Sequence, residues 1–132
     1  MDTLDVPRIP TLRVTPDQAK LLPNDPGHPS VRMMSHGSME LRWFVPRPGE
    51  CHAPHDRDEV YFVASGTATF IRGNESDPFD EGALGAFGDQ RVPVEPGDVL
   101  FVPAGAQHSF AETSGDFGVW ALFYGPEGGE RP

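Results

Sequence analysis

Hydrophobic and polar residues alternate with a period of two in much of the chain from residue 38 onward. The first such segment, SMELRWFVP, places Leu41 and Trp43 on one side and Glu40 and Arg42 on the other. Successive side chains of a β-strand point to opposite faces, so this pattern predicts a strand.

Further runs of β-branched and aromatic residues predict strands within residues 59–66, 67–72, 98–105, 108–112 and 117–125. The first two runs meet at Ser65 and Gly66, which predicts a tight hairpin. Residues 73–90 are rich in glycine and acidic residues and are predicted to form a long surface loop. Several short strands without alternating helices favour an all-β fold, either a sandwich or a barrel.

The first thirty-odd residues are polar and interrupted by prolines, which predicts an N-terminal arm. We expect one short helix in it, with Thr15 as the N-cap, Pro16 at the first helical position, Gln18 completing a capping box and Pro23 ending the turn. The predicted division is an arm over residues 1–35, a barrel domain over residues 36–125 and a frayed tail over residues 126–132.

The length and composition agree with one small β-domain. A chain of 132 residues can bury one core but not two. Its 15 prolines and 15 glycines are too many for a helical bundle, because each interior proline costs a helix about 3 kcal/mol.

The charge of the chain disfavours nucleic acid and membrane surfaces as partners. Twenty acidic residues stand against ten basic ones, for a formal net charge of -10, and such a surface repels phosphates and anionic lipids. The single cysteine, Cys51, cannot close an intrachain disulfide. The start MDTLDVPRIP has no signal-peptide character, so we expect a cytoplasmic protein.

Candidate metal ligands occur close to the predicted strand ends. His55 and Glu59 lie before and at the start of one strand, and His108 follows a Pro-x-Gly turn. Imidazole and carboxylate groups are common metal ligands, and three of them could converge in a curled sheet or barrel. Without a metal they would form a polar pocket floor, and isolated loop histidines such as His28 and His36 need no chemical role.

Two segments resemble the two signature motifs of the cupin superfamily. In the first, three residues separate His55 from Glu59, and six separate Glu59 from Gly66. In the second, Gly97 is followed by five residues, Pro103-Ala104-Gly105, two residues and His108.

The resemblance implies a single antiparallel β-barrel of the jelly-roll type, also called a double-stranded β-helix, which is usually a homodimer. It also implies that His55, Glu59 and His108 face inward and bind a divalent metal ion, with Fe, Mn, Zn, Ni and Cu all open. The expected partner is a small-molecule substrate or ligand.

The chain departs from the family pattern once in each motif. The family's first motif histidine would stand at residue 53, which is Ala53, while a histidine stands one residue earlier at His52. A regular strand would aim His52 away from the pocket, whereas a bulge would turn it back, so His52 is a candidate fourth metal ligand. Cys51 is left outside the ligand set, and Glu112 replaces the family's asparagine.

Parity along the strands gives expectations for the other pocket residues. Phe110 should share the inward face of His108, whereas Tyr61 and Trp120 are expected in the core or an interface. Glu40 and Arg42 share the polar side of their strand and could line the mouth of the pocket, but solvent exposure is expected for both.

The candidate ligands favour a small-molecule metalloenzyme. The resemblance implies a dioxygenase, an isomerase or a lyase, and the sequence does not select among these reaction types. The alternative is a noncatalytic cupin that binds or senses a metal or a small ligand. A third possibility is a purely structural or dimerising barrel with a vestigial site. Independently of these functions, we expect the N-terminal arm to cross to a partner barrel.

Overall fold

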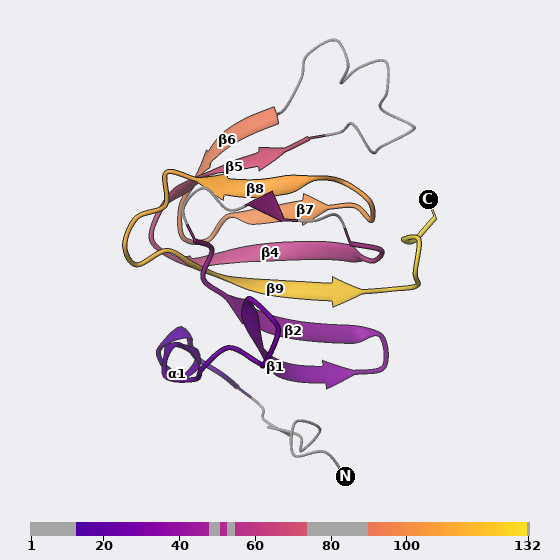
Figure 1. Cartoon of the computed structure of the whole chain (residues 1–132), viewed down its shortest axis with the longest axis horizontal. Coiled ribbons are helices and arrows are strands. Elements are labelled where there is room, and N and C mark those ends of the chain that lie inside the picture. Colours follow the sequence, from indigo (N-terminus) through magenta and orange to yellow (C-terminus); the bar gives the residue numbers. More distant parts are fainter. Residues whose placement is uncertain (1–12, 48–50, 53–54, 74–89, 132) are drawn as a thin grey trace.

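The computed structural model describes residues 13–47, 51–52, 55–73 and 90–131, and in these ranges the chain is mainly β-structure. Two antiparallel sheets pack on each other (Figure 1). Sheet A has the strand order β1-β2-β9-β4-β7, and sheet B the order β3-β8-β5-β6. The elements are α1 (Pro16–Lys20), β1 (Ser30–His36), β2 (Met39–Phe44), β3 (Cys51–His52), β4 (Asp58–Ser65), β5 (Ala68–Arg72), β6 (Gln90–Val94), β7 (Val99–Val102), β8 (His108–Ala111) and β9 (Gly118–Tyr124). The predicted all-β fold is confirmed.

The main hydrophobic core lies between the two sheets. Tyr61 of β4 packs against Phe70 of β5 and Phe110 of β8, with ring centroids 6.1 and 5.1 Å apart. All three side chains are buried, as is Val119 of β9. Full burial of such side chains contributes about 1.5–3 kcal/mol each to folding. This core holds β4 opposite β8, and these two strands carry Glu59 and His108.

A second, smaller core covers part of the outer face of sheet A. Trp43 of β2 and Trp120 of β9 are cross-strand partners whose rings meet edge to face, with centroids 4.7 Å apart. Ala19 of α1 and Val31 of β1 are buried in the same cluster. In Figure 1 the helix lies beside β1 and β2.

The predicted capping box fixes helix α1. The Thr15 side chain accepts a hydrogen bond from the backbone N–H of Gln18, and the Gln18 side chain accepts one from the N–H of Thr15. Pro16 stands at the start of the helix, as expected. Within the described residues there is no helix with the length and apolar character needed to cross a membrane.

The expected exposure of Arg42 is wrong. Its side chain is buried on the inner face of sheet A and pairs with Asp25, at 2.7 Å, and with Glu40, at 2.5 Å. Its Nε also donates to the hydroxyl of Ser30 at 2.6 Å. Glu40 is half-buried and also pairs with Arg57, at 3.0 Å. An ion-pair chain therefore runs from Asp25 through Arg42 and Glu40 to Arg57.

The predicted hairpin at Ser65 and Gly66 is also wrong. Strand β4 pairs with β7 and β9, whereas β5 pairs with β6 and β8, so the turn carries the chain from sheet A to sheet B. Gly66 has a φ of 72°, and a Cβ there would lie 2.6 Å from the backbone of Phe117. This close approach directs the chain into the second sheet.

Two segments are more ordered than the sequence pattern indicated. Residues 30–36, which fall mostly within the predicted arm, form β1 and pair with β2. In the predicted tail, the N–H of Gly128 donates to the carbonyl of Asp56 at 2.6 Å, and the N–H of Glu130 to the carboxylate of Asp58 at 2.8 Å. The tail is therefore not frayed at these residues. The first part of the arm and most of the long loop lie outside the described residues.

Tight packing in the second core predicts that one added methyl group at Gly118 lowers the stability of the fold. A Cβ at Gly118 would lie 2.4 Å from the Trp43 ring, so we expect Gly118→Ala to destabilise the fold by about 2 kcal/mol through overpacking. Gly115→Ala is the matched control, because a Cβ there meets no atom within 4 Å. Chemical denaturation measures both, and equal stability of the two variants would contradict the packing.

The ion-pair chain predicts a loss of stability in acid. Burial alone would raise the pKa of Glu40, but hydrogen bonds and charges from Arg42 and Arg57 outweigh burial, so the pKa lies below its ordinary value of 4.5. The stabilisation by ionised Glu40 is therefore complete above pH 4.5 and is lost as the pH falls through the lowered pKa.

Denaturation of the wild type and of Glu40→Gln, from neutral pH into acid, measures this loss of stability. The stability difference between them should shrink as the pH is lowered, whereas Glu127→Gln, at an exposed carboxylate, is the control for the change of charge. A difference that stays constant from neutral pH into acid would contradict the lowered pKa.

Candidate metal centre

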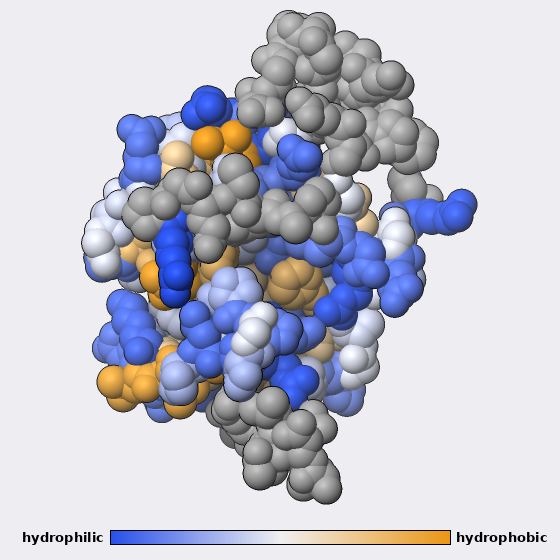
Figure 2. Space-filling model, in the orientation of Figure 1, coloured by the Kyte–Doolittle hydropathy of each residue, from blue (hydrophilic) through white to orange (hydrophobic). Residues whose placement is uncertain are grey.

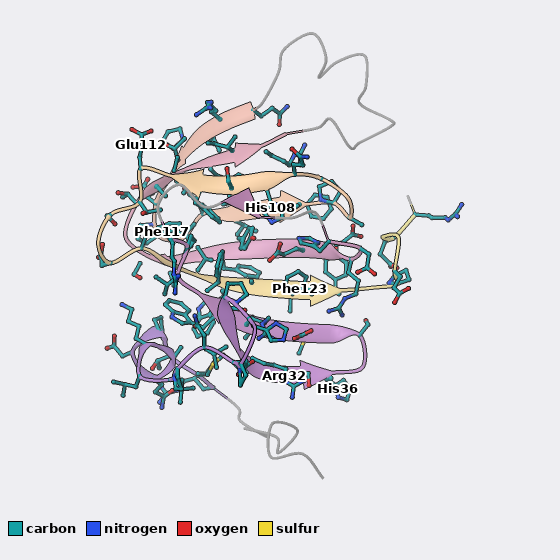
Figure 3. The ribbon with its side chains drawn as sticks, viewed as in Figure 1. Arg32, His36, His108, Glu112, Phe117 and Phe123 are labelled. Carbon is teal, nitrogen blue, oxygen red and sulfur yellow. The ribbon has the colours of Figure 1, made fainter. Side chains whose placement is uncertain are left out.

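Three potential metal ligands converge where the two sheets meet. Glu59 lies on β4 of sheet A, His108 begins β8 of sheet B, and His55 lies in the segment before β4. One ligand atom from each residue lies within 4.8 Å of the others. Figure 3 shows His108 on its strand across from Phe123 of β9, the cross-strand partner of Glu59.

The strand period places Glu59 inside the molecule. Glu59, Tyr61 and Val63 alternate with Val60 and Phe62 along β4, and the first three are at most 3% exposed. Glu59 itself is 1% exposed. The carboxylate therefore lies on the core face of sheet A, facing sheet B.

The second motif brings His108 to the same place. Gly105 has a φ of 86°, which glycine adopts readily, and its N–H donates to the carbonyl of His55 at 2.8 Å. The N–H of the preceding Ala104 donates to the carboxylate of Asp58 at 2.9 Å. These bonds join the turn before His108 directly to the segment that carries His55.

Backbone carbonyls orient both histidine rings. His55 Nδ1 lies 2.8 Å from the carbonyl oxygen of Arg57, and His108 Nδ1 lies 3.1 Å from that of Ala106. A carbonyl oxygen only accepts hydrogen bonds, so each Nδ1 carries a proton. Each Nε2 then faces Glu59 Oε1, at 2.7 Å for His55 and 3.6 Å for His108.

The buried carboxylate changes the acid–base behaviour of two neighbours. Burial alone would lower the pKa of His55, but the hydrogen bond and the charge of Glu59 outweigh burial, so the pKa is raised. Burial, followed by the charge and hydrogen bond of Glu59, raises the pKa of the Tyr61 hydroxyl well above its ordinary value. Tyr61 therefore stays protonated at neutral pH and acts as a hydrogen-bond donor.

The three groups can hold one divalent metal ion. Nitrogen and oxygen ligands lie about 2.0–2.2 Å from ions such as Zn²⁺, so two ligands of one ion are at most about 4.4 Å apart. The observed limit of 4.8 Å is close to that value. Histidines that donate Nδ1–H to a fixed oxygen and present Nε2 are typical of metal sites.

The remaining candidates lie on or next to strands β3 and β8 of sheet B. His52 lies on β3, where its backbone pairs with His108, and Cys51 pairs with Ser109. The side chains of these two residues, and residue Ala53 as a whole, lie outside the described part of the chain. Glu112, with a φ of 53°, accepts a hydrogen bond from Thr69 at 3.0 Å and lies at the other end of β8 from His108 (Figure 3).

Sequence reasoning placed some neighbours of the site and missed others. Phe110 is buried in the main core beside His108, as expected, and Trp120 packs in the second core. Tyr61 belongs to the core but also contacts the site, with its ring 5.9 Å from that of His108. Its position two residues after Glu59 on one strand face could have indicated this. Arg57 and Asp58 act through bonds to distant segments, which no local pattern reveals.

Comparison with known proteins gives one sequence relative and several structural ones. An uncharacterized protein of Streptomyces coelicolor is 38% identical over 74 residues, which are 56% of each chain. The chain thus spans about half the length of this curated relative.

Three solved structures illustrate the structural likeness. BH2720 from Bacillus halodurans aligns with a TM-score of 0.60 at 15% identity, over 93% of this chain and 86% of that one. A Cupin 2 conserved barrel domain protein from Salinispora arenicola aligns with a TM-score of 0.51 at 21% identity, over 80% and 87% of the two chains. Hydroxypropylphosphonic acid epoxidase from S. wedmorenis gives a TM-score of 0.47 at 16% identity, over 66% of this chain and 44% of that one.

The sequence also matches a family model directly. The model described as "Cupin domain" covers residues 42–122, which include both motif segments and nearly all of sheets A and B outside β1. This chain therefore belongs to the cupin-domain family.

Proposed function

We propose that this protein is a small-molecule metalloenzyme in which His55, Glu59 and His108 hold a divalent metal ion. The observation that carries the proposal is the shared target of the three groups: two imidazole Nε2 atoms lie 2.7 and 3.6 Å from one buried carboxylate oxygen. The reaction is of the dioxygenase, isomerase or lyase type, and Fe, Mn, Zn, Ni and Cu all suit such donors.

His52 is proposed as the fourth ligand. Its backbone lies directly opposite His108 in the pairing of β3 with β8. Directly opposite positions of an antiparallel pair share one face of the sheet. Residue 52 therefore occupies a register position from which a ligand can join the site.

The protein's own groups prepare the site for a small substrate. When bound, the ion polarises a substrate oxygen or activates dioxygen. Carbonyls of Arg57 and Ala106 hold the two imidazoles, and the hydroxyl of Tyr61 donates a hydrogen bond to Glu59. The aromatic rings of Phe70 and Phe110 pack beside Tyr61 and exclude water, which strengthens every polar interaction inside.

Metal content of purified and reconstituted protein tests the proposal. We expect about one ion per chain after loading with Fe, Mn, Zn, Ni or Cu, and a loss of more than about tenfold in affinity for His55→Ala and His108→Ala. His52→Ala should weaken binding without abolishing it. His36→Ala is the matched control, because His36 is exposed at the end of β1, away from His108 (Figure 3).

Each result of the metal-binding experiment has a distinct interpretation. A wild type that stays metal-free after loading with all five metals would refute the metal site. If the metal binds with the expected ligand dependence, the ion found determines the substrate screen, with dioxygen consumption as the first assay for a redox-active metal. A stoichiometric metal site without turnover would favour the noncatalytic binding or sensing role.

We further propose that a second copy of this chain covers the exposed side of sheet A. Val60 and Phe62 of β4 pair with Phe101 and Val99 of β7 on the outer face. Phe62, Val99 and Phe101 are 39%, 60% and 46% exposed. The view in Figure 2 shows a mostly hydrophilic surface with separate apolar patches, one of them beside α1. The paired residues of β4 and β7 form one contiguous apolar stripe, and an exposed stripe favours self-association.

Sedimentation velocity tests the dimer. The wild type should sediment with the mass of two chains, and Phe101→Glu should sediment as one chain, because the substitution buries an unpaired carboxylate in the interface. Val92→Glu on β6 is the matched control, since Val92 is 45% exposed on the other sheet. A monomeric wild type, or a Phe101→Glu variant that remains dimeric, would contradict this interface.

A further inference from the structure

We propose that Arg57 is a positioning residue for the metal site, and that its guanidinium, held by Glu40, fixes the backbone carbonyl that orients His55. The inference rests on the proposed function, because it concerns the metal affinity of the same site. In this role the Arg57 side chain affects the metal through His55 and does not itself need to touch the ion.

The backbone of Arg57 contacts His55 directly. The Arg57 carbonyl oxygen accepts the Nδ1–H of His55 at 2.8 Å, which leaves Nε2 directed at Glu59 Oε1, 2.7 Å away. A displacement of this carbonyl would rotate the imidazole or change which nitrogen carries the proton. The direction of the His55 ligand atom therefore depends on the position of the Arg57 backbone.

The side chain of Arg57 is held at three points. One guanidinium nitrogen donates to the carbonyl of Ser38 at 2.8 Å and the other pairs with Glu40 at 3.0 Å. The guanidinium carbon lies 5.6 Å from the centroid of the Phe123 ring, within cation–π range. Phe123 in turn meets the His55 ring edge to face at 5.1 Å. Arg57 thus supports His55 through its carbonyl and through Phe123.

Glu40 is itself fixed in position. Its second carboxylate oxygen pairs with Arg42 at 2.5 Å, and Arg42 is held by Asp25 at 2.7 Å and by the hydroxyl of Ser30 at 2.6 Å. Buried ion pairs add little net stability compared with apolar packing, but they fix side-chain geometry. The chain from Asp25 to Arg57 gives the guanidinium one defined place beside the site.

Simple electrostatics makes the opposite prediction to positioning. Arg57 is a cation close to a site for a cation, so removal of its charge would tighten metal binding if charge alone mattered. If Arg57 instead holds His55 in place, its removal must weaken binding. The sign of the change in affinity therefore separates the two roles.

The experiment measures Zn²⁺ affinity by competition with a chromophoric chelator. We expect Arg57→Gln to weaken Zn²⁺ binding about tenfold, the range found for residues that orient metal ligands. Arg57→Lys should also weaken it, because lysine keeps the charge but not the forked contact with Ser38 and Glu40. Arg91→Gln on β6 removes the same charge from an exposed position and should leave the affinity within about twofold.

A double-mutant cycle tests the route through Arg57. Glu40→Gln should weaken Zn²⁺ binding in the wild-type background and have no further effect in the Arg57→Gln background. Thermal unfolding without metal identifies variants that do not fold, and Arg57→Lys carries the test if Arg57→Gln is one of them.

The outcomes separate this inference from the proposed function. Wild-type protein without Zn²⁺ affinity, or a His55→Ala variant that binds normally, would refute the metal site itself. A His55-dependent site whose affinity is unchanged or tighter in Arg57→Gln would overturn the positioning role alone. Additive effects of Glu40→Gln and Arg57→Gln would overturn the transmission from Glu40.

Discussion

The burial of Glu59 is the constraint on which the rest of the structure depends. Its side chain is 1% exposed on the core face of β4, and an ionised carboxylate there costs several kcal/mol unless other groups compensate it. The compensating groups are His55 and His108, with Tyr61 as a hydrogen-bond donor. His55 and Tyr61 lie close to Glu59 in the sequence, whereas His108 comes from sheet B. The full set of compensating groups is therefore complete only when the sheets pack with β4 opposite β8.

Strand β2 departs from the usual arrangement of an antiparallel sheet at two positions on its inner face. Such sheets commonly bury an apolar face and expose a polar one. On β2, by contrast, Glu40 and Arg42 face inward and Trp43 faces outward, where α1 and β1 cover it. Both faces thus need partners: the inner polar residues find them in Asp25 and Arg57, and the outer apolar residues in the second core. The ion-pair chain and the Trp43 cluster are two consequences of one strand orientation.

The sequence reveals the features that depend on local spacing. Six strands and helix α1 follow from alternation and capping, and the spacing of His55, Glu59 and Gly66 indicates the first motif. The sequence misleads where the decisive contact is distant. The Ser65-Gly66 segment has the sequence of a hairpin turn, yet its close approach to Phe117 directs the following strand into the other sheet. Arg42 looks exposed because its partner Asp25 lies 17 residues away, and Asp58 binds residue 130 of the expected frayed tail.

The position of His52 shows why counting along one strand is insufficient. The parity argument measures His52 against His55 and places the two on opposite faces of a regular strand. That comparison has no basis in the fold, because β3 belongs to sheet B, whereas the strand after His55 belongs to sheet A. The relevant reference is His108, which lies directly opposite residue 52 in an antiparallel pair. Opposite positions share a face. Cross-strand register therefore supports His52 as a ligand, whereas parity along one strand counted against it. Sheet B would then contribute two ligands, sheet A one, and the segment between them the fourth.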